Sequence, residues 1–195
     1  MFDSNYEKSD KLFFHDKIMR ITVLKLIPRK LVPNHFTFLR FLTAPLVGLL
    51  ILYQHYTVAL IAFLLVAFTD TIDGSLARTR NQVTNWGRIY DPLADKILIG
   101  LMVFLIVLRY IGLWTAALII GIEAAIILVA WFRKKEGARI QSNIWGKIKM
   151  LLQVTGVIIL LLSVVLNWAE ILPLASGALY LAIAFAIISL LTYGI

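Results

Sequence analysis

Hydrophobic residues along this chain gather in six long segments, and polar residues gather in the short stretches between them. A helix needs about 20 mostly apolar residues to cross the hydrocarbon core of a bilayer. The segments that reach this length are 35–54, 57–78, 91–110, 112–132, 146–167 and 171–193. This pattern predicts an all-α integral membrane protein with six transmembrane helices.

The first 33 residues follow a different pattern, in which basic residues alternate with short apolar runs. Such a mixture is typical of an amphipathic helix that lies on the anionic cytoplasmic face of a membrane. A disordered basic tail is the alternative. We therefore expect a cytoplasmic amphipathic juxtamembrane segment over residues 1–33 and a six-helix membrane domain over residues 34–195.

The composition and the placement of charge agree with a membrane protein. Hydrophobic residues make up 61% of the chain, charged residues only 15%, and the formal net charge is +8. Seven of the nineteen lysine and arginine residues precede residue 31, four lie between residues 78 and 96, and six lie between residues 133 and 149. Cytoplasmic segments of membrane proteins carry such an excess of basic residues. We therefore expect a multi-pass protein of the cell membrane with both termini in the cytoplasm, and no nucleic-acid partner.

Four of the eleven acidic residues lie where the second and third apolar segments meet. Asp70 and Asp73 are three residues apart, and Asp91 and Asp95 are four apart, so each pair projects from one face of a helix. Carboxylates this close at a membrane edge repel one another unless a cation binds among them. The spacing therefore predicts a divalent-metal site of hard oxygen ligands, facing the cytoplasm.

Two further features of this stretch bear on its chemistry. Gly74 and Ala77 fall on the same helix face as Asp70, which leaves the backbone there open to a bulky ligand. Arg78 follows, and a planar guanidinium can form a forked pair of hydrogen bonds with a phosphate. Asp91 has a second interpretation, because aspartate followed by proline is a favoured helix start, and a capping carboxylate is less available to a metal. Residues 79–90 would then form a short polar turn.

The acidic stretch resembles a known family of membrane enzymes. At every fixed position and gap it matches the signature DxxDGxxAR, eight residues, GxxxDxxxD of the CDP-alcohol phosphotransferases. The matching residues are Asp70, Asp73, Gly74, Ala77, Arg78, Gly87, Asp91 and Asp95. The resemblance implies a six-helix membrane enzyme, often a homodimer, that passes the phosphoryl-bearing part of a CDP-linked substrate to an alcohol and releases CMP.

The resemblance also implies roles for individual residues. Asp70, Asp73 and Asp91 would hold two divalent ions, Mg²⁺ or Mn²⁺. Asp95 would contact the second ion and act as the catalytic base that takes the proton from the acceptor hydroxyl. The residues implied to line the nucleotide and diphosphate are Asn34, Thr37, Gly74, Ala77, Arg78 and Gly87.

Three segments, two outside the signature and one that overlaps it, are similar to the phosphatidylglycerophosphate synthases of this family. They are PNxxTxxR from Pro33 to Arg40, DPLADK from Asp91 to Lys96, and GKIK from Gly146 to Lys149. This similarity implies CDP-diacylglycerol as donor and glycerol 3-phosphate as acceptor, with a lipid bilayer around the enzyme. The chain departs from those synthases at Ile122, where they carry arginine, and at Met150, where threonine usually follows GKIK.

Four residues are candidates for the acceptor site. Glu123 is a carboxylate inside an apolar segment, which indicates either a functional group or a structural partner for a basic or hydroxyl side chain. Arg139, Lys147 and Lys149 lie near the start of the fifth apolar segment, where they would attract an anionic acceptor. Plain cytoplasmic placement of basic residues explains Arg133, Lys134 and Lys135 in the same stretch.

Other functions stay open on the sequence. Within the family, the acceptor or donor would be phosphatidylglycerol as in cardiolipin synthases, an inositol phosphate, or a CDP-choline-like donor. A membrane cation carrier is the candidate from another class, although carriers place such acids near the membrane midplane. Glycines at 112, 121, 156 and 177 are interpreted as sites of close helix packing rather than of chemistry.

Overall fold

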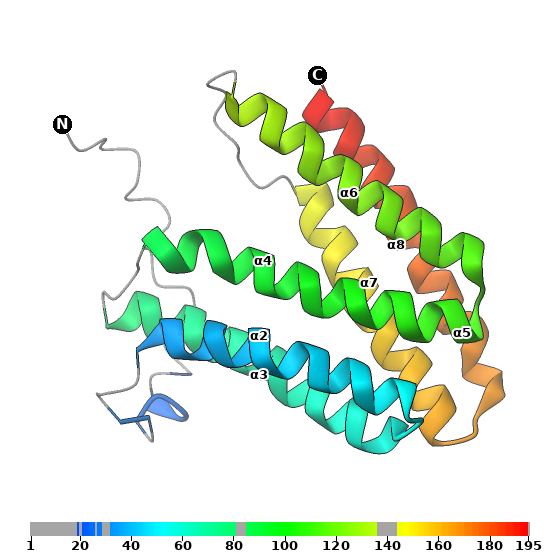
Figure 1. The fold of residues 1–195 in the computed structure, drawn as a ribbon, viewed down its shortest axis with the longest axis horizontal. Coiled ribbons are helices and arrows are strands. Elements are labelled where there is room, and N and C mark those ends of the chain that lie inside the picture. Colours follow the sequence, from blue (N-terminus) through cyan, green and yellow to red (C-terminus); the bar gives the residue numbers. More distant parts are fainter. Residues whose placement is uncertain are drawn as a thin grey trace. The chain divides into compact units, whose positions relative to one another are not determined.

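Helices make up the fold of this protein. The computed structural model describes residues 19, 21–25, 27–28, 32–80, 85–135 and 144–194, and this part of the chain contains no β-strand. The helices are α2 (Pro33–Leu52), α3 (Tyr56–Thr79), α4 (Asn85–Met102), the π-helical η2 (Val103–Val107), α5 (Leu108–Tyr110), α6 (Leu113–Lys135), α7 (Ile144–Val165), the 3₁₀ turn η3 (Ala169–Ile171) and α8 (Leu172–Gly194) (Figure 1). Each of the six expected apolar segments is therefore helical over nearly all of its length.

Five of these helices are long and apolar enough to cross a membrane, namely α2, α3, α6, α7 and α8 with η3. Helix α4 is not among them, because its 18 residues include Arg88, Asp91, Asp95 and Lys96. The prediction of an all-α integral membrane protein is thus confirmed as far as helices and their composition go. The expected helix within residues 1–33 falls mostly outside the described residues.

The helix surfaces carry the side chains expected next to lipid. Large apolar residues such as Leu65, Leu151 and Leu181 are exposed, whereas Thr37 and Arg40 are buried. A soluble protein would show the reverse distribution. The exposed apolar surface therefore indicates that hydrocarbon, rather than water, surrounds these helices.

The chain divides into two compact units, and α2, α3 and α4 each contribute to both. The first unit comprises Met1–Val47 and Ile61–Leu98, and the second comprises Gly48–Leu60 and Ile99–Ile195. In the first unit, Met19 and Leu24 of the N-terminal segment are buried against Ile72 and Leu76 of α3. The described part of that segment therefore packs on a helix of the membrane domain.

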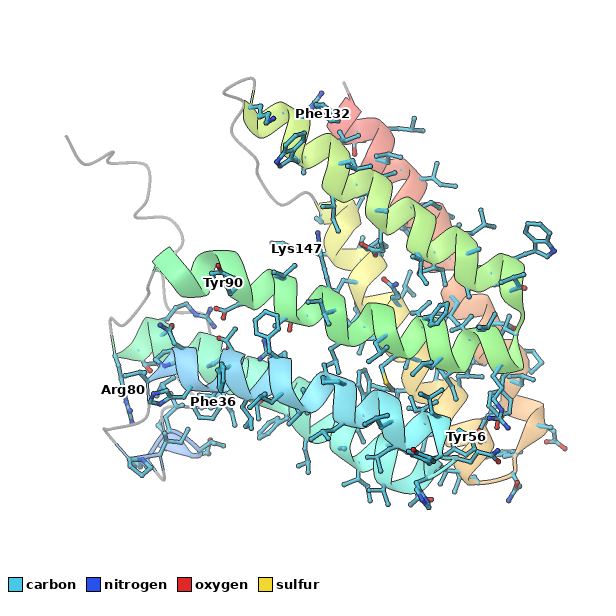
Figure 2. All side chains as sticks on the ribbon, in the orientation of Figure 1. Phe36, Tyr56, Arg80, Tyr90, Phe132 and Lys147 are labelled. Carbon is cyan, nitrogen blue, oxygen red and sulfur yellow. The ribbon has the colours of Figure 1, made fainter. Side chains whose placement is uncertain are left out.

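Hydrogen bonds that Arg80 donates attach the same N-terminal segment to the end of α3. The guanidinium donates to the carbonyl oxygens of Ile27 at 2.7 Å and Pro28 at 3.2 Å (Figure 2). These carbonyls belong to irregular backbone, which needs such donors when it is not part of a helix. Arg80 thus contributes to holding the segment on α3.

In the second unit, α7 packs along α8, and α6 packs along the other side of α8 (Figure 1). Gly156 of α7 permits the close approach of α8, since a Cβ at this position would lie 2.8 Å from the Leu179 Cγ. Helix ends in this part of the chain use left-handed backbone, as at Gly112, which has φ of +134° between α5 and α6.

Candidate active site

The centre of the candidate site is Arg40, which is completely buried in the first unit. Its Nη2 lies 2.8 Å from Oδ2 of Asp73 on α3, and its Nη1 lies 2.9 Å from Oδ1 of Asp95 on α4. The side chains of Arg40 and Asp73 are 0% and 4% exposed, and that of Asp95 is 17% exposed. One guanidinium from α2 therefore joins motif carboxylates from two other helices.

Thr37 makes the third link between α2 and the acidic motif. It lies one helical turn before Arg40, so both side chains project from the same face of α2. Its hydroxyl is buried and donates a hydrogen bond to Oδ1 of Asp91 on α4. The described motif acids Asp73, Asp91 and Asp95 are thus all held by two neighbouring side chains of α2.

The capping interpretation of Asp91 is wrong. Helix α4 begins at Asn85, so Asp91 lies within the helix rather than at its N-cap. Residues 85–90, which were expected to belong to a polar turn, form the first turns of α4. Because its carboxylate accepts a hydrogen bond from Thr37, Asp91 belongs to the acidic site.

The residues expected along the diphosphate lie on the same part of α3. The Arg78 Nη1 lies 3.4 Å from the position that a Cβ on Gly74 would occupy, so the guanidinium covers the bare backbone of this turn. Ala77 is half-buried beside it. A larger side chain at Gly74 would displace the Arg78 guanidinium.

The remaining signature positions are placed only in part. Asp70 lies on α3 and Gly87 on α4, but the side chain of Asp70 is not described. Asn34 lies in the first turn of α2, half-buried and one turn before Thr37. Among the side chains that are described, no three of histidine, cysteine, aspartate or glutamate come together closely enough to hold a metal ion.

The chemistry of the described donors nevertheless suits Mg²⁺ or Mn²⁺, which prefer carboxylate oxygens. Arg40 contacts one oxygen of Asp73 and one of Asp95, and a carboxylate has two oxygens that can bind different cations. Arg40 and the three described acids carry a formal charge of −2, from one positive and three negative groups. This remaining negative charge favours binding of a divalent cation.

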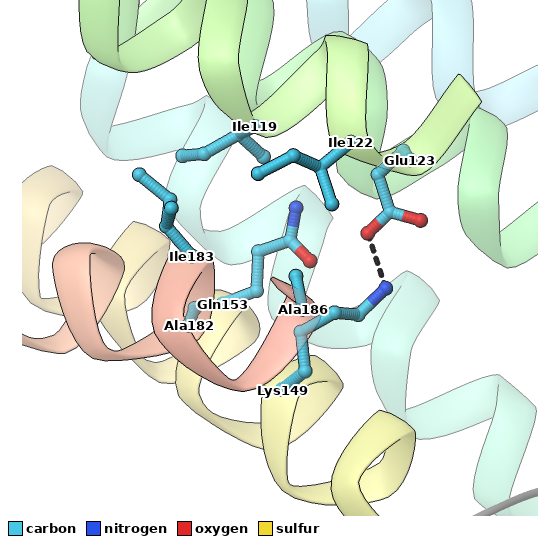
Figure 3. Close-up of a pocket in the computed structure, with 8 residues that line it drawn as sticks. All are labelled: Ile119, Ile122, Glu123, Lys149, Gln153, Ala182, Ile183 and Ala186. Carbon is cyan, nitrogen blue, oxygen red and sulfur yellow. Dashed lines mark hydrogen bonds and ion pairs between the residues drawn. The ribbon is translucent and has the colours of Figure 1, made fainter. Parts of the chain in front are cut away.

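Glu123 and Lys149 form an ion pair in the second unit (Figure 3). Lys149 Nζ on α7 donates to Glu123 Oε1 on α6, and the two side chains are 11% and 21% exposed, respectively. The interpretation of Glu123 as the partner of a basic side chain in the bundle is confirmed. Lys147 is exposed on the first turn of α7, and Arg139 lies outside the described residues.

A small cavity adjoins this ion pair. It is lined by Ile119, Ile122, Gln153 and residues of α8 (Figure 3). Its volume is about 10 Å³, which is space for roughly one water molecule. The cavity is too small for glycerol 3-phosphate, so a role of Glu123 and Lys149 in acceptor binding stays a prediction.

Sequence reasoning did not assign Arg40 to the site, although it is part of the PNxxTxxR segment. A signal for it was present, since Arg40 is an ionised residue inside an apolar segment of membrane-spanning length. Such residues are costly in a membrane and are usually paired or functional. Its partners are 33 and 55 residues away in sequence, at Asp73 and Asp95, and no local pattern identifies them.

Comparison with known proteins agrees with this site. The profile of the CDP-alcohol phosphatidyltransferase family matches residues 30–191. The chain belongs to this family. It is therefore an enzyme, a phosphatidyltransferase of phospholipid biosynthesis, and the cation-carrier alternative is set aside.

Three relatives illustrate the range of the similarity. The CDP-diacylglycerol–glycerol-3-phosphate 3-phosphatidyltransferase of Bacillus subtilis is 34% identical over 130 residues, covering 66% of this chain and 67% of the relative. The enzyme of the same name from Pseudomonas fluorescens is 35% identical over 141 residues, covering 67% and 71%. A cardiolipin synthase (CMP-forming) / mitochondrial hydrolase fusion protein of Schizosaccharomyces pombe is 39% identical over 105 residues, covering 53% of this chain and 18% of the relative.

Proposed function

We propose that this phosphatidyltransferase moves the phosphatidyl group of CDP-diacylglycerol to a hydroxyl of glycerol 3-phosphate and releases CMP. The observation that carries the proposal is the similarity to two bacterial enzymes named for this reaction, each over about two thirds of both chains. The family generally depends on divalent metal ions. The buried acidic site, held together by α2, supports the same chemistry.

In the proposed site, Asp70, Asp73, Asp91 and Asp95 hold two divalent ions, Mg²⁺ or Mn²⁺. When bound, such ions neutralise the diphosphate and stabilise the charge that develops on the leaving group. Asp73, Asp91 and Asp95 offer the carboxylate oxygens that these ions prefer. Thr37 and Arg40 orient these carboxylates from α2.

The transfer itself makes one bond and breaks one bond. The acceptor hydroxyl oxygen bonds to the phosphorus of the phosphatidyl group, and the bond between this phosphorus and the oxygen bridging to CMP breaks. Asp95 accepts the hydroxyl proton, and CMP leaves with the bridging oxygen. Asp95 suits this role because part of its side chain is accessible while Arg40 holds one of its oxygens.

Further residues of the chain are proposed to bind the substrates. Arg78 contacts the diphosphate over the bare backbone of Gly74, which supplies both a fixed charge and close access. The nucleotide is bound by Asn34, Thr37, Ala77 and Gly87. For the anionic phosphate of the acceptor, the candidate side chains are Glu123, Arg139, Lys147 and Lys149, with Glu123 orienting Lys149.

A second candidate acceptor is phosphatidylglycerol, with cardiolipin as product. The relatives include proteins named cardiolipin synthase, among them the fusion protein described above. Ile122 also favours this alternative, because it places an apolar side chain where the phosphatidylglycerophosphate synthases carry arginine. A lipid acceptor has no need of the second phosphate-binding group that this arginine would supply.

We further propose six spans in the cell membrane, with the acidic site facing the cytoplasm. The sixth span is the continuous helical run of α4, η2 and α5 from Asn85 to Tyr110, which is long enough to cross with its charged first turns at the cytoplasmic surface. Residues 1–33 form the juxtamembrane segment and residues 34–195 the membrane domain. A homodimer follows from the family resemblance.

Release of CMP by purified protein in detergent tests the proposed reaction. CDP-diacylglycerol and Mg²⁺ are supplied with glycerol 3-phosphate, phosphatidylglycerol or inositol phosphate in separate reactions. We expect release with glycerol 3-phosphate, its loss in EDTA, and a decrease of at least about 100-fold in Asp95→Asn. Glu170→Gln is the matched control, because this exposed carboxylate accepts a hydrogen bond from Trp168 and lies 75 residues beyond Asp95 in the sequence.

The acceptors separate the two candidate reactions. Release with phosphatidylglycerol alone would replace glycerol 3-phosphate and leave the mechanism intact. Full activity of Asp95→Asn would overturn the proposed base. If folded protein released no CMP with any acceptor, the proposed transfer itself would be wrong.

A further inference from the structure

Arg40 is an arginine whose charge is entirely removed from solvent in the first unit. Its side chain is 0% exposed, and it forms ion pairs with two carboxylates of the acidic motif. A buried guanidinium is costly unless its charge is compensated, and here Asp73 and Asp95 supply that compensation from two helices. The reverse also holds, since Asp73 is 4% exposed and needs a cation beside it.

We propose that Arg40 is the protein's own counter-cation at the acidic site, a positioning residue that shares the carboxylates of Asp73 and Asp95 with the catalytic divalent ions. In the metal-free protein Arg40 holds these two carboxylates on one guanidinium, so that the site exists before a metal binds. This inference rests on the proposed function, because it requires that the same carboxylates bind metal.

The proposal predicts that Arg40 lowers the affinity of the site for a divalent ion. A divalent ion that binds Asp73 and Asp95 brings a second positive charge close to Arg40, and like charges at such distances repel. Arg40 and the metal therefore weaken each other's interactions, and the coupling between them is equal in both directions. A purely structural arginine has the opposite effect, because its removal would disorder the ligands and weaken metal binding.

Arg40 also explains how the acidic site can stay folded when its metal ions leave. Three acids that had only metal ions as counter-charges would repel one another strongly whenever the metals left. With Arg40 in place, the net charge of the described group falls from −3 to −2. The metal-free site is stabilised and the affinity for the metal is moderated by the same residue.

Mn²⁺ binding and thermal unfolding of Arg40→Met test this inference without reference to activity. Met retains much of the length of the arginine side chain and removes its charge. In EDTA, we expect the unfolding midpoint of Arg40→Met to fall by about 10 °C, since a buried ion pair has lost one partner. With Mn²⁺ alone as the probe, followed by the electron paramagnetic resonance of the free ion, we expect its affinity to rise by about tenfold.

Two further variants sharpen the comparison. Arg40→Lys keeps one positive charge without the fork, so its midpoint in EDTA should lie between those of the wild type and Arg40→Met. Arg109→Met is the matched control, because Arg109 lies over the rings of Tyr56 and Tyr110 in the second unit. It should leave Mn²⁺ affinity unchanged.

The outcomes separate this inference from the proposed function. Tighter Mn²⁺ binding by Arg40→Met, with a larger Mn²⁺-induced rise of its midpoint than in the wild type, would support it. Equal or weaker binding by the variant, beside normal binding by the wild type, would overturn it and leave the metal site intact. No binding by the wild type would overturn the metal site and this inference together. Purification of Arg40→Met in Mn²⁺ keeps the affinity measurable if its metal-free form does not fold.

Discussion

The hydroxyl of Thr37 is fully buried and donates a hydrogen bond to Asp91. Valine has nearly the same shape as threonine but lacks this hydroxyl. Thr37→Val keeps the shape of the side chain and removes the donor. We expect CMP release to fall about 10- to 100-fold, because groups that orient metal-binding carboxylates have effects of this size. The unfolding midpoint should fall by only a few degrees.

Thr43 provides the control for this change on the same helix. Its hydroxyl donates to the Leu39 carbonyl oxygen at 2.9 Å, within α2. The same hydroxyl lies 3.3 Å from the backbone carbonyl oxygen of Arg40. Thr43→Val removes a threonine hydroxyl whose bonds are to backbone oxygens of α2, so activity should stay within about twofold of the wild type. Equal losses of activity in both variants would show that the hydroxyl of Thr37 has no special role at Asp91.

At the scale of single residues, the sequence identified candidate side chains for the site but not how they are paired. The spacing of Asp70 and Asp73 or of Asp91 and Asp95 gives the face of one helix, which is local information. The bonds from Arg40 to Asp73 and from Thr37 to Asp91 join residues 33 and 54 positions apart. Such partners depend on how helices pack, and the periodicity of a single sequence does not contain this information.

At the scale of elements, helix packing distinguishes glycines that look alike in sequence. A Cβ on Gly156 would lie 2.8 Å from the Leu179 Cγ and 3.3 Å from the Ala175 carbonyl oxygen. At Gly177, a Cβ would meet no described atom within 4 Å beyond its own helix and chain neighbours. The interpretation of these glycines as close packing is confirmed at Gly156, whereas a Cβ on Gly112, Gly121 or Gly177 would meet no such neighbour among the described residues.

This difference predicts opposite effects of the same substitution. Gly156→Ala should lower the unfolding midpoint in detergent by about 2–4 °C, because overpacking between α7 and α8 outweighs the better helix propensity of alanine. Gly177→Ala gains the propensity without the clash, so its midpoint should stay unchanged or rise. A fall of equal size in both variants would mean that contact with Leu179 does not limit the packing at Gly156.

Helix boundaries were predictable where an apolar segment ends in polar residues and not where polar residues continue the helix. The expected segments 57–78 and 146–167 correspond to Tyr56–Thr79 and Ile144–Val165. Helix α4 instead starts at Asn85, ahead of the Asp91–Pro92 pair that resembles a helix start. Contacts of Asp91 with α2 stabilise this extension, and a local capping signal does not include such contacts.

At the scale of the whole molecule, the number of spans decides which chain segments share the cytoplasmic face. Five helices satisfy the length and composition of a membrane span, and the run from Asn85 to Tyr110 is the proposed sixth. If this run did not cross, every connection after it would change sides. The chain segment between α6 and α7 would then face outward, although residues 133–149 carry six of the nineteen lysine and arginine residues.

Single cysteines distinguish the two topologies, and the chain has no cysteine of its own. The positions are His55→Cys as an outward reference, and Leu113→Cys, Ser142→Cys and Glu170→Cys as tests. With six spans, a membrane-impermeant maleimide added outside intact cells should label positions 55, 113 and 170 and leave 142 unlabelled until the cells are opened. With five spans, labelling at 113, 142 and 170 would be inverted while 55 stayed outward. The inverted pattern would remove Asn85–Tyr110 as a span and place the basic segment of residues 133–149 on the outer side of the membrane.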